Sequence, residues 1–209
     1  MHGVKIAKID AGGGREATVF LTYDNDKLIV SFDVRDDSPM KNAAKDFAML
    51  FKGGDACDVM LGADPKADPK RARPVAGDVR LLFSVMDDKP VCVLYAPVAG
   101  KAEKKPRTFS SPTGNEEFER VVVVEDAKVI VARKEGGYVL EAGVPLAAVG
   151  LVPQPGTLLR GDVGVLFSDP GGSRTVLRAY YANRQAAIVN DIPSEARLEP
   201  QRWALLKVE

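Results

Sequence analysis

Apolar and polar residues alternate along much of the chain, and this alternation predicts strands. In Lys27–Arg35 every second residue is apolar, and the residues between them are mostly polar, which is the period of a half-buried strand. Residues 17–23 show the same alternation, and the turn Asp24-Asn25-Asp26 separates the two runs. Two such runs around an Asx-rich turn predict a β-hairpin with one face in the core and one face polar.

Nine further runs have strand character, and clusters of Gly, Pro, Asp or Asn separate most of them: 56–61, 79–86, 90–95, 120–124, 128–133, 138–144, 162–167, 174–182 and 203–208. So many short strands predict an all-β fold, an antiparallel β-sandwich of two sheets, jelly-roll or immunoglobulin-like. Only residues 145–150, with Pro first and Gly last, and residues 42–51 predict short helical turns.

Two long connections, residues 62–77 and 96–117, carry few large apolar residues and are predicted to be structureless loops, which are often functional or mobile. No shift in composition marks a boundary, so residues 1–209 are interpreted as a single domain. The chain starts in domain-like sequence without a signal peptide. We therefore expect a module excised from a larger protein.

Composition excludes several function classes. The 29 basic and 29 acidic residues balance, so no field of one sign attracts nucleic acid or an anionic membrane. No apolar run is long enough to span a membrane. The single histidine, His2, argues against Ser-His-Asp or Cys-His catalysis and against a His-rich zinc site. Cys57 and Cys92 lie in predicted strands and are interpreted as buried free thiols, although a disulfide stays open.

Several segments, in the same order, resemble motifs of the family 9 carbohydrate-binding modules and their relatives. Residues 20–37 resemble the opening hairpin of that family, and Gly54-Asp-Ala-Cys-Asp-Val-Met-Leu61 resembles its next strand. Gly137-Tyr-Val-Leu-Glu-Ala-Gly-Val-Pro-Leu146 and Gly161-Asp-Val-Gly-Val-Leu-Phe167 resemble two later strands, and residues 203–208 fit the closing strand. The resemblance covers nearly the whole chain.

This resemblance implies a non-catalytic module that binds a polysaccharide or oligosaccharide and targets a linked domain to it. It also implies an extracellular, cell-surface or periplasmic location, in a bacterial protein. In the family, a sugar lies between two aromatic rings and polar side chains bond its hydroxyls. Stiff aromatic rings suit the apolar face of a sugar, and carboxylate, amide and guanidinium groups supply directional hydrogen bonds.

The resemblance also nominates carbohydrate-binding residues. One family aromatic position is occupied by Lys52, with Phe51 beside it as a substitute ring, and Asp58 aligns with a family glutamate. The remaining candidates are polar or aromatic residues of later strands: Arg80, Ser168, Tyr181 and Asn183. Neither tryptophan expected by the family is present, which predicts weaker stacking.

Structural roles compete with these assignments. Phe51 is equally a candidate for the core, and Trp203 is interpreted as a core or rim packing residue. Asp58 and Arg80 can form an ion pair between neighbouring strands. Tyr180 and Tyr181 face opposite sides of one predicted strand, and we expect Tyr181 to be the exposed one. Four carboxylates suggest a structural calcium site, because calcium prefers oxygen ligands, although a solvated acidic strand end also explains them: Asp33, Asp36, Asp37 and Asp55, with Asp36 and Asp37 nominated as ligands.

Two other function classes stay open. One is a haem-binding electron-transfer domain with a methionine axial ligand, paired with a lysine or His2; the candidates are Met40, Met49, Met60 and Met86. The other is a protein-interaction or spacer sandwich without sugar binding. No pair of carboxylates is nominated for glycoside hydrolysis, because the adjacent Glu116 and Glu117 would face opposite sides of a strand.

Overall fold

The computed structural model describes the backbone of residues 2–208 and the side chains of residues 7–208. One of its two main sheets has five strands in the order β1-β2-β3-β11-β10. These strands are β1 (His2–Gly12), β2 (Arg15–Tyr23), β3 (Lys27–Arg35), β11 (Gly137–Pro145) and β10 (Lys128–Lys134). The hairpin expected around residues 24–26 is confirmed as β2–β3, with Phe20 opposite Ser31.

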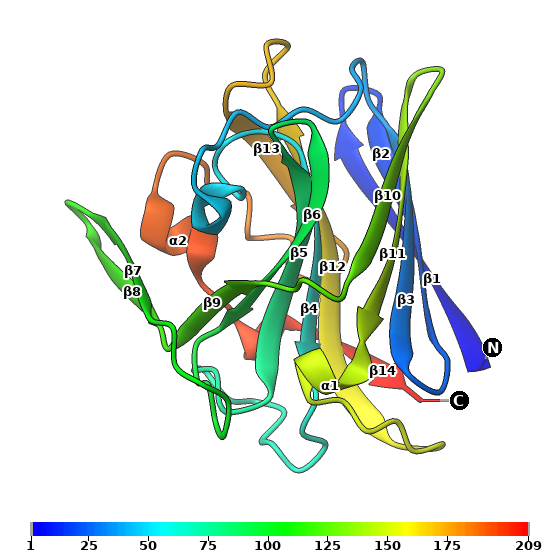
Figure 1. Cartoon of the computed structure of the whole chain (residues 1–209), viewed down its shortest axis with the longest axis vertical. Helices are drawn as coiled ribbons and strands as arrows, with labels where there is room; N and C mark the ends of the chain where they lie inside the picture. Colours follow the sequence, from blue (N-terminus) through cyan, green and yellow to red (C-terminus); the bar gives the residue numbers. More distant parts are fainter. Residues whose placement is uncertain (1, 209) are drawn as a thin grey trace.

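The second main sheet has seven strands, and both sheets pair antiparallel throughout. Its order is β13 (Thr175–Tyr180), β12 (Leu158–Ser168), β4 (Ala56–Gly62), β5 (Asp78–Met86), β6 (Lys89–Ala96) and β9 (Arg120–Val123), and β14 (Ala204–Lys207) pairs with β12 as well. The two sheets lie face to face (Figure 1). The predicted all-β antiparallel sandwich is therefore confirmed.

The main core lies between the two sheets. From β3 the alternate residues Val30, Phe32 and Val34 enter it, and from the second sheet Leu81 and Val165 meet them. The residues between them on β3 are partly or fully exposed, so the predicted polar outer face of this hairpin is confirmed. Apolar burial on one face therefore fixes the register of β3, because a shift of one residue would turn the whole apolar set outward.

The seven-stranded sheet is buried on its outer face as well. Every residue of β4 is buried, and so is all of β5 except Met86. Three parts of the chain, called here the outer cover, pack on that face. They are η1 (Phe47–Met49), the hairpin of β7 (Arg107–Ser111) with β8 (Gly114–Phe118), and residues 183–203 with α2 (Ile192–Ala196) and η2 (Pro200–Arg202). Figure 1 shows the hairpin and α2 on the side of this sheet away from the five-stranded one.

The outer cover corrects one prediction. Residues 96–117 were expected to be structureless, but the second half of this segment forms β7 and most of β8. Phe109 and Phe118 are the reason, because both are buried. Phe109 packs against Phe51 and Tyr95, and Phe118 packs against Tyr95 and Phe109, with ring centroids 5.3–6.3 Å apart. Of the two predicted helical turns, one contains η1 and the other contains α1 (Leu146–Val149).

The short helix α2 is specified by its first residues. Asp191 is its N-cap, where its carboxylate accepts a hydrogen bond from the Ser194 backbone N–H at 3.2 Å. Glu195 returns the interaction, because its carboxylate accepts the Asp191 N–H at 3.1 Å. Pro193 sits in the first turn, where no intrahelical N–H is needed. This reciprocal capping holds a five-residue helix that would be unstable alone.

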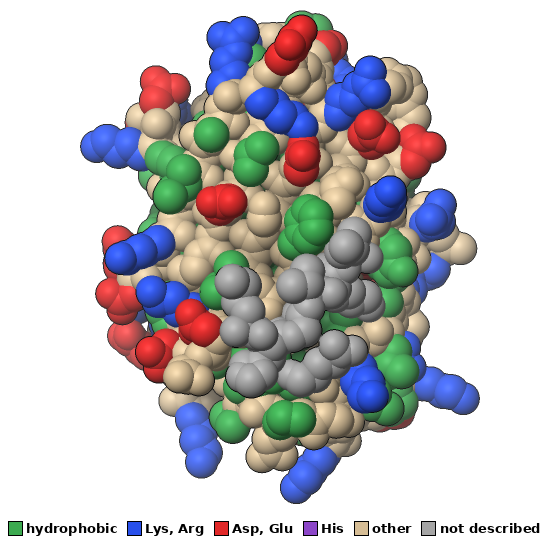
Figure 2. Space-filling view, turned by 90° about the vertical axis from the view of Figure 1, so that its right-hand side faces the viewer, with side chains coloured by type: hydrophobic (Ala, Val, Ile, Leu, Met, Phe, Trp, Pro, Cys, Tyr) green, Lys and Arg blue, Asp and Glu red, His purple; other side chains and the backbone are tan. Residues whose placement is uncertain are grey.

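Acidic and basic side chains are mixed on the face shown in Figure 2, so the balance seen in the composition also holds locally there. Within residues 2–208, no helix is both long and apolar enough to cross a lipid bilayer.

Both cysteines are confirmed as buried free thiols. Cys57 lies opposite Phe83, and Phe83 lies opposite Cys92, so two strand spacings of about 9–10 Å in total separate them. That distance is too long for a disulfide. Burial raises the pKa of both thiols.

We expect no reaction of either thiol with a disulfide reagent such as Ellman's reagent in the native protein, because the reactive form is the thiolate. In denaturant both thiols should react within minutes. Rapid release of chromophore from the native protein would contradict the buried positions.

Candidate functional site

A buried ion pair lies at the centre of the outer face of the seven-stranded sheet. Asp58 on β4 and Arg80 on β5 are diagonal neighbours, since Asp58 lies opposite Leu82 and Arg80 opposite Met60. Arg80 donates from Nε and Nη2 to the two carboxylate oxygens of Asp58, each at 2.7 Å. Neither side chain is exposed. The structure thus confirms that these residues pair across neighbouring strands, in the bidentate geometry that suits a guanidinium and a carboxylate.

Tyr180 on β13 extends this pair. Its hydroxyl donates to Asp58 at 2.6 Å and accepts from Arg178 Nη2 at 2.9 Å. Gly164 of β12 lies between β4 and β13, and an added Cβ there would be 2.3 Å from the Tyr180 ring. The glycine therefore allows the ring to lie across β12 and reach Asp58.

Helix α2 packs over this network, and its residue Glu195 forms hydrogen bonds with three basic side chains. The Glu195 carbonyl accepts from Arg80 Nη1 at 3.0 Å and from Arg178 Nη2 at 2.9 Å. Its carboxylate, which is fully buried, accepts from Lys52 Nζ at 2.7 Å. Burial alone would lower the pKa of Arg80, but the charge and hydrogen bonds of Asp58, together with Tyr180 and Tyr95, outweigh the effect of burial and raise the pKa. Arg80 thus stays charged beneath the outer cover.

The structure brings four of the nominated residues together, because Phe51 and Lys52 lie beside the pair of Asp58 and Arg80. The Arg80 guanidinium lies 5.4 Å from the centre of the Phe51 ring. Phe51, Asp58 and Arg80 are nevertheless fully buried. A glycan can touch them only if the outer cover moves.

The other three nominated residues lie apart from that group. Ser168 is the last residue of β12, four residues and about 13 Å along the strand from Gly164, which lies opposite Asp58. Its backbone N–H donates to Asp55. Tyr181 is more exposed than Tyr180, as expected. It packs against the core between the sheets, on the opposite face from Asp58. Asn183 follows β13 and lies on the outer side, beside Tyr180.

A polar cleft of about 220 Å³ opens beside this network, between the edge of the sheet and residues 183–203. Tyr180 and Arg178 form part of its wall, and Asn183 stands beside them. The Asn183 side-chain amide donates to Glu199 at 2.8 Å, and Arg202 donates to the other Glu199 oxygen at 3.1 Å. Hydrogen-bonding side chains thus converge where the outer cover leaves the sheet edge open.

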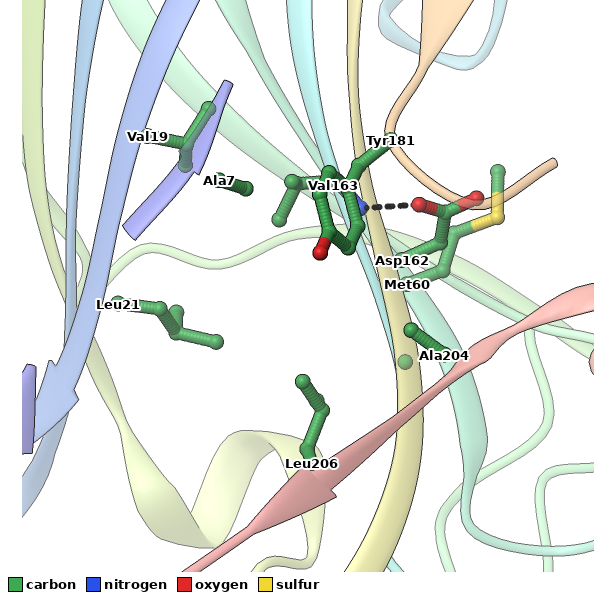
Figure 3. Close-up of a pocket in the computed structure, with 10 residues that line it drawn as sticks. Ala7, Val19, Leu21, Met60, Asp162, Val163, Tyr181, Ala204 and Leu206 are labelled. Carbon is green, nitrogen blue, oxygen red and sulfur yellow. Dashed lines mark hydrogen bonds between the residues drawn. The ribbon is translucent and has the colours of Figure 1, made fainter. Parts of the chain in front are cut away.

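Below the cleft, β12 has a gap in its pairing. Leu158–Gly161 pair with β14 and Gly164–Ser168 pair with β13, so Asp162 and Val163 lie between the two partners. An apolar slot opens there, with Tyr181 and Leu206 on one side and Leu21 on the other (Figure 3). Asp162 also lines the slot. Its carboxylate accepts hydrogen bonds from the backbone N–H groups of Val163, Ala182 and Asn183 at 2.8–2.9 Å.

Burial raises the pKa of Asp162 from 3.8 to about 6, despite these hydrogen bonds. The folded state therefore binds this proton more tightly than the unfolded state. The stability that Asp162 contributes is complete below pH 4 and is lost as the pH rises through about 6. We expect the free energy of unfolding of the wild type, relative to Asp162→Asn, to fall by about 2–3 kcal/mol between pH 4 and 7. Urea denaturation at several pH values measures this difference, and parallel profiles would refute the raised pKa.

The nominated calcium ligands do not fit a cation in this arrangement. Arg15 donates to Asp36 at 3.0 Å and lies 3.5 Å from Asp37. A guanidinium therefore occupies the position between the two carboxylates. Within residues 7–208 no three His, Cys, Asp or Glu side chains form a cluster suited to a metal. Calcium there stays a prediction that requires Arg15 to be displaced.

The haem alternative stays a prediction, and Met60 is its candidate ligand in the apolar slot. Met60 lines the apolar slot, but neither lysine nor histidine is among the described residues that line it. His2 lies outside the described side chains. The described residues therefore offer Met60 no second axial ligand in that slot.

The sequence prediction missed most of the cleft, whose unpredicted wall includes Arg178, Tyr180, Arg197, Glu199 and Arg202. One signal was present in the chain. Residues 191–195, Asp-Ile-Pro-Ser-Glu, combine an N-cap residue, an early proline and an acid in the first turn, which is typical of a helix start. Recognising α2 would have placed a cover beside β13.

Neither a family model nor a curated protein matches the sequence. The structure, in contrast, resembles two solved structures of a family 9 carbohydrate-binding module from Caldicellulosiruptor kristjanssonii, one in complex with cellotriose and one in complex with glucose. The TM-scores are 0.57 and 0.56, at 13% and 14% sequence identity. The matches cover 99% and 100% of this chain, and 82% and 84% of those chains. This chain therefore has the fold of the family 9 carbohydrate-binding modules.

Proposed function

We propose that this chain is a non-catalytic carbohydrate-binding module that holds an oligosaccharide, or part of a polysaccharide, in the polar cleft. The carrying observation is the convergence of Tyr180, Asn183 and Arg178 in the lining of the cleft between the sheet edge and the outer cover. Amide, hydroxyl and guanidinium groups are the partners that sugar hydroxyls require. The solved modules that share this fold bind cellotriose and glucose, which supports the same ligand class here.

In this proposal the nominated residues have unequal roles. Asn183 contacts the sugar, whereas Asp58 and Arg80 position the Tyr180 hydroxyl and α2 from beneath. Phe51 and Lys52 also act indirectly, because the Phe51 ring packs against the Arg80 guanidinium and Lys52 forms an ion pair with Glu195. Ser168 and Tyr181 stay predictions of the resemblance, and a glycan at Tyr181 would have to enter the apolar slot.

The carboxylates near the cleft support a binding role over catalysis. Both oxygens of Asp58 already accept hydrogen bonds from Arg80, and one also accepts from Tyr180. Both oxygens of Glu199 are engaged by Asn183 and Arg202. A glycosidase needs one carboxylic acid free to protonate the leaving group and one carboxylate facing it across the bond.

We further propose that the module acts outside the cytoplasm and keeps linked domains of a bacterial protein near their glycan, by raising the effective concentration.

A glycan array followed by titration calorimetry tests this function. We expect Asn183→Ala to weaken binding of the best glycan about tenfold, because a buried partner of a sugar hydroxyl is lost. Asn115→Ala, at an exposed position of the β7–β8 hairpin, is the matched control and should bind normally. Loss of binding in Tyr181→Phe, with Asn183→Ala unaffected, would favour the residue nominated by the resemblance. A folded protein that binds no glycan would overturn the proposal.

A further inference from the structure

We propose that the cleft selects acidic sugars, and that Arg178 receives the carboxylate of a hexuronate residue, with Arg197 and Arg202 at the rim. This inference rests on the proposed function and specifies its ligand class. The cleft has three arginines and one glutamate in its lining. The glutamate, Glu199, is already used within the lining, because it binds Arg202 and Asn183.

Arg178 differs from the other buried arginines of the chain. Arg80 is paired with Asp58, and Arg71 is paired with Asp78. Arg178 is 4% exposed, yet within residues 7–208 no carboxylate lies within 4.0 Å of its guanidinium. An enclosed cation without a counter-charge is unfavourable by several kcal/mol. An anionic ligand would remove that penalty.

The hydrogen bonds of Arg178 are also incomplete. Its Nη atoms donate to the Tyr180 hydroxyl and to the backbone carbonyls of Glu195 and Ile188, at 2.9–3.3 Å. Its Nε is buried and has no acceptor among the described residues. Unsatisfied buried donors are rare in folded proteins. Here the donor belongs to the residue that also lacks a counter-charge, on the wall of a cavity.

The surroundings suit a sugar acid better than a simple anion. Asn183 and Gln185 provide amides for ring hydroxyls, and Ile188 provides an apolar surface. Arg197, held by Glu116 of the hairpin at 3.0 Å, and Arg202 are both partly exposed. Guanidinium groups bind carboxylates through two parallel hydrogen bonds, so one ring can be held by its acid group and its hydroxyls together.

Calorimetry with three trisaccharides tests this inference: trigalacturonate, its fully methyl-esterified form and cellotriose. We expect trigalacturonate to bind at least about tenfold more tightly than its ester, as for one charge-assisted hydrogen-bonded contact. The advantage should shrink as the salt concentration rises. Arg178→Gln should remove this advantage, so that the ratio of the affinities for the acid and the ester falls to about one.

Because Arg178 is buried, Arg202→Gln at the rim provides a second variant, expected to reduce the same advantage in part. Arg133→Gln on β10, an exposed arginine of the other sheet, is the matched control. Equal affinities for the acid and its ester would overturn the inference and leave the proposed function standing. Displacement of trigalacturonate by an equal concentration of inorganic sulfate, or tighter binding of a sulfated neutral trisaccharide, would also overturn it. Failure of all three trisaccharides and of the glycan array would overturn both.

Discussion

Replacing Asp58 by alanine is expected to lower the free energy of unfolding by about 3–5 kcal/mol, because it leaves the Arg80 guanidinium enclosed without a counter-charge. Arg80 and Asp58 are both fully buried and joined by two hydrogen bonds of 2.7 Å. The Tyr180 hydroxyl loses its acceptor in the same variant. Urea denaturation monitored by circular dichroism measures the loss.

The exposed pair of Glu16 and Arg35 is a matched control, since these residues also form an ion pair between neighbouring antiparallel strands. Glu16→Ala should cost less than about 1 kcal/mol. The double variant Asp58→Leu with Arg80→Met should be more stable than Asp58→Ala, because it removes the isolated charge together with its partner. A loss below 1 kcal/mol in Asp58→Ala would show that water reaches Arg80, and that the outer cover is open in solution.

Phe109→Ala is expected to lower the free energy of unfolding by a similar amount, about 3–5 kcal/mol. The Phe109 ring is 5.3 Å from Phe51 and 5.5 Å from Phe118, both at steep angles. Its removal opens a cavity between the hairpin and the sheet. Phe20→Ala on the outer face of β2, where the ring is partly exposed, should cost about 1 kcal/mol or less.

Hydrogen exchange gives this prediction a second readout. Loss of the Phe109 contacts should speed exchange in β7 and β8 more than in β4 and β5, because the hairpin is held on the sheet by its two phenylalanines. Uniform acceleration over all strands would show that the hairpin is an integral part of the sandwich and not a separable cover. If the variant binds a glycan more tightly than the wild type, the sequence prediction that Phe51, Asp58 and Arg80 contact the sugar gains support.

The strands could be predicted because their signal is local. In β3 the alternation of Val30, Phe32 and Val34 with polar residues predicts both that the segment is a strand and which of its faces is buried. The interpretation of Trp203 as a core residue is confirmed, since it is 2% exposed, and the pairing of Asp58 with Arg80 followed from neighbouring strands. These features depend on residue spacing within one or two segments.

The outer cover could not be predicted in the same way, because it depends on contacts between distant segments. Phe109 and Phe118 are the only large apolar residues of the polar segment 107–118, and their partners Phe51 and Tyr95 lie more than a dozen residues earlier. Leu82, facing outward on β5, was the clearest available sign, since a strand with apolar residues on both faces must be covered on both. The prediction that Tyr181 is more exposed than Tyr180 is confirmed. It is Tyr180, however, that lies on the same face of the sheet as Asp58 and binds it, and the expected exposure could not show this.

The assembly of the seven-stranded sheet from scattered segments also sets an order of events during synthesis. Strand β4 is made early but pairs with β12, about 100 residues later, and residues 183–203 are made later still. Until they emerge from the ribosome, the apolar outer surface around Leu82, Val93 and Tyr95 has no complete covering. A nascent chain in that state presents the kind of surface that chaperones bind and that drives aggregation. Slow folding and a dependence of yield on temperature and chaperone supply therefore follow from the position of α2 in the chain.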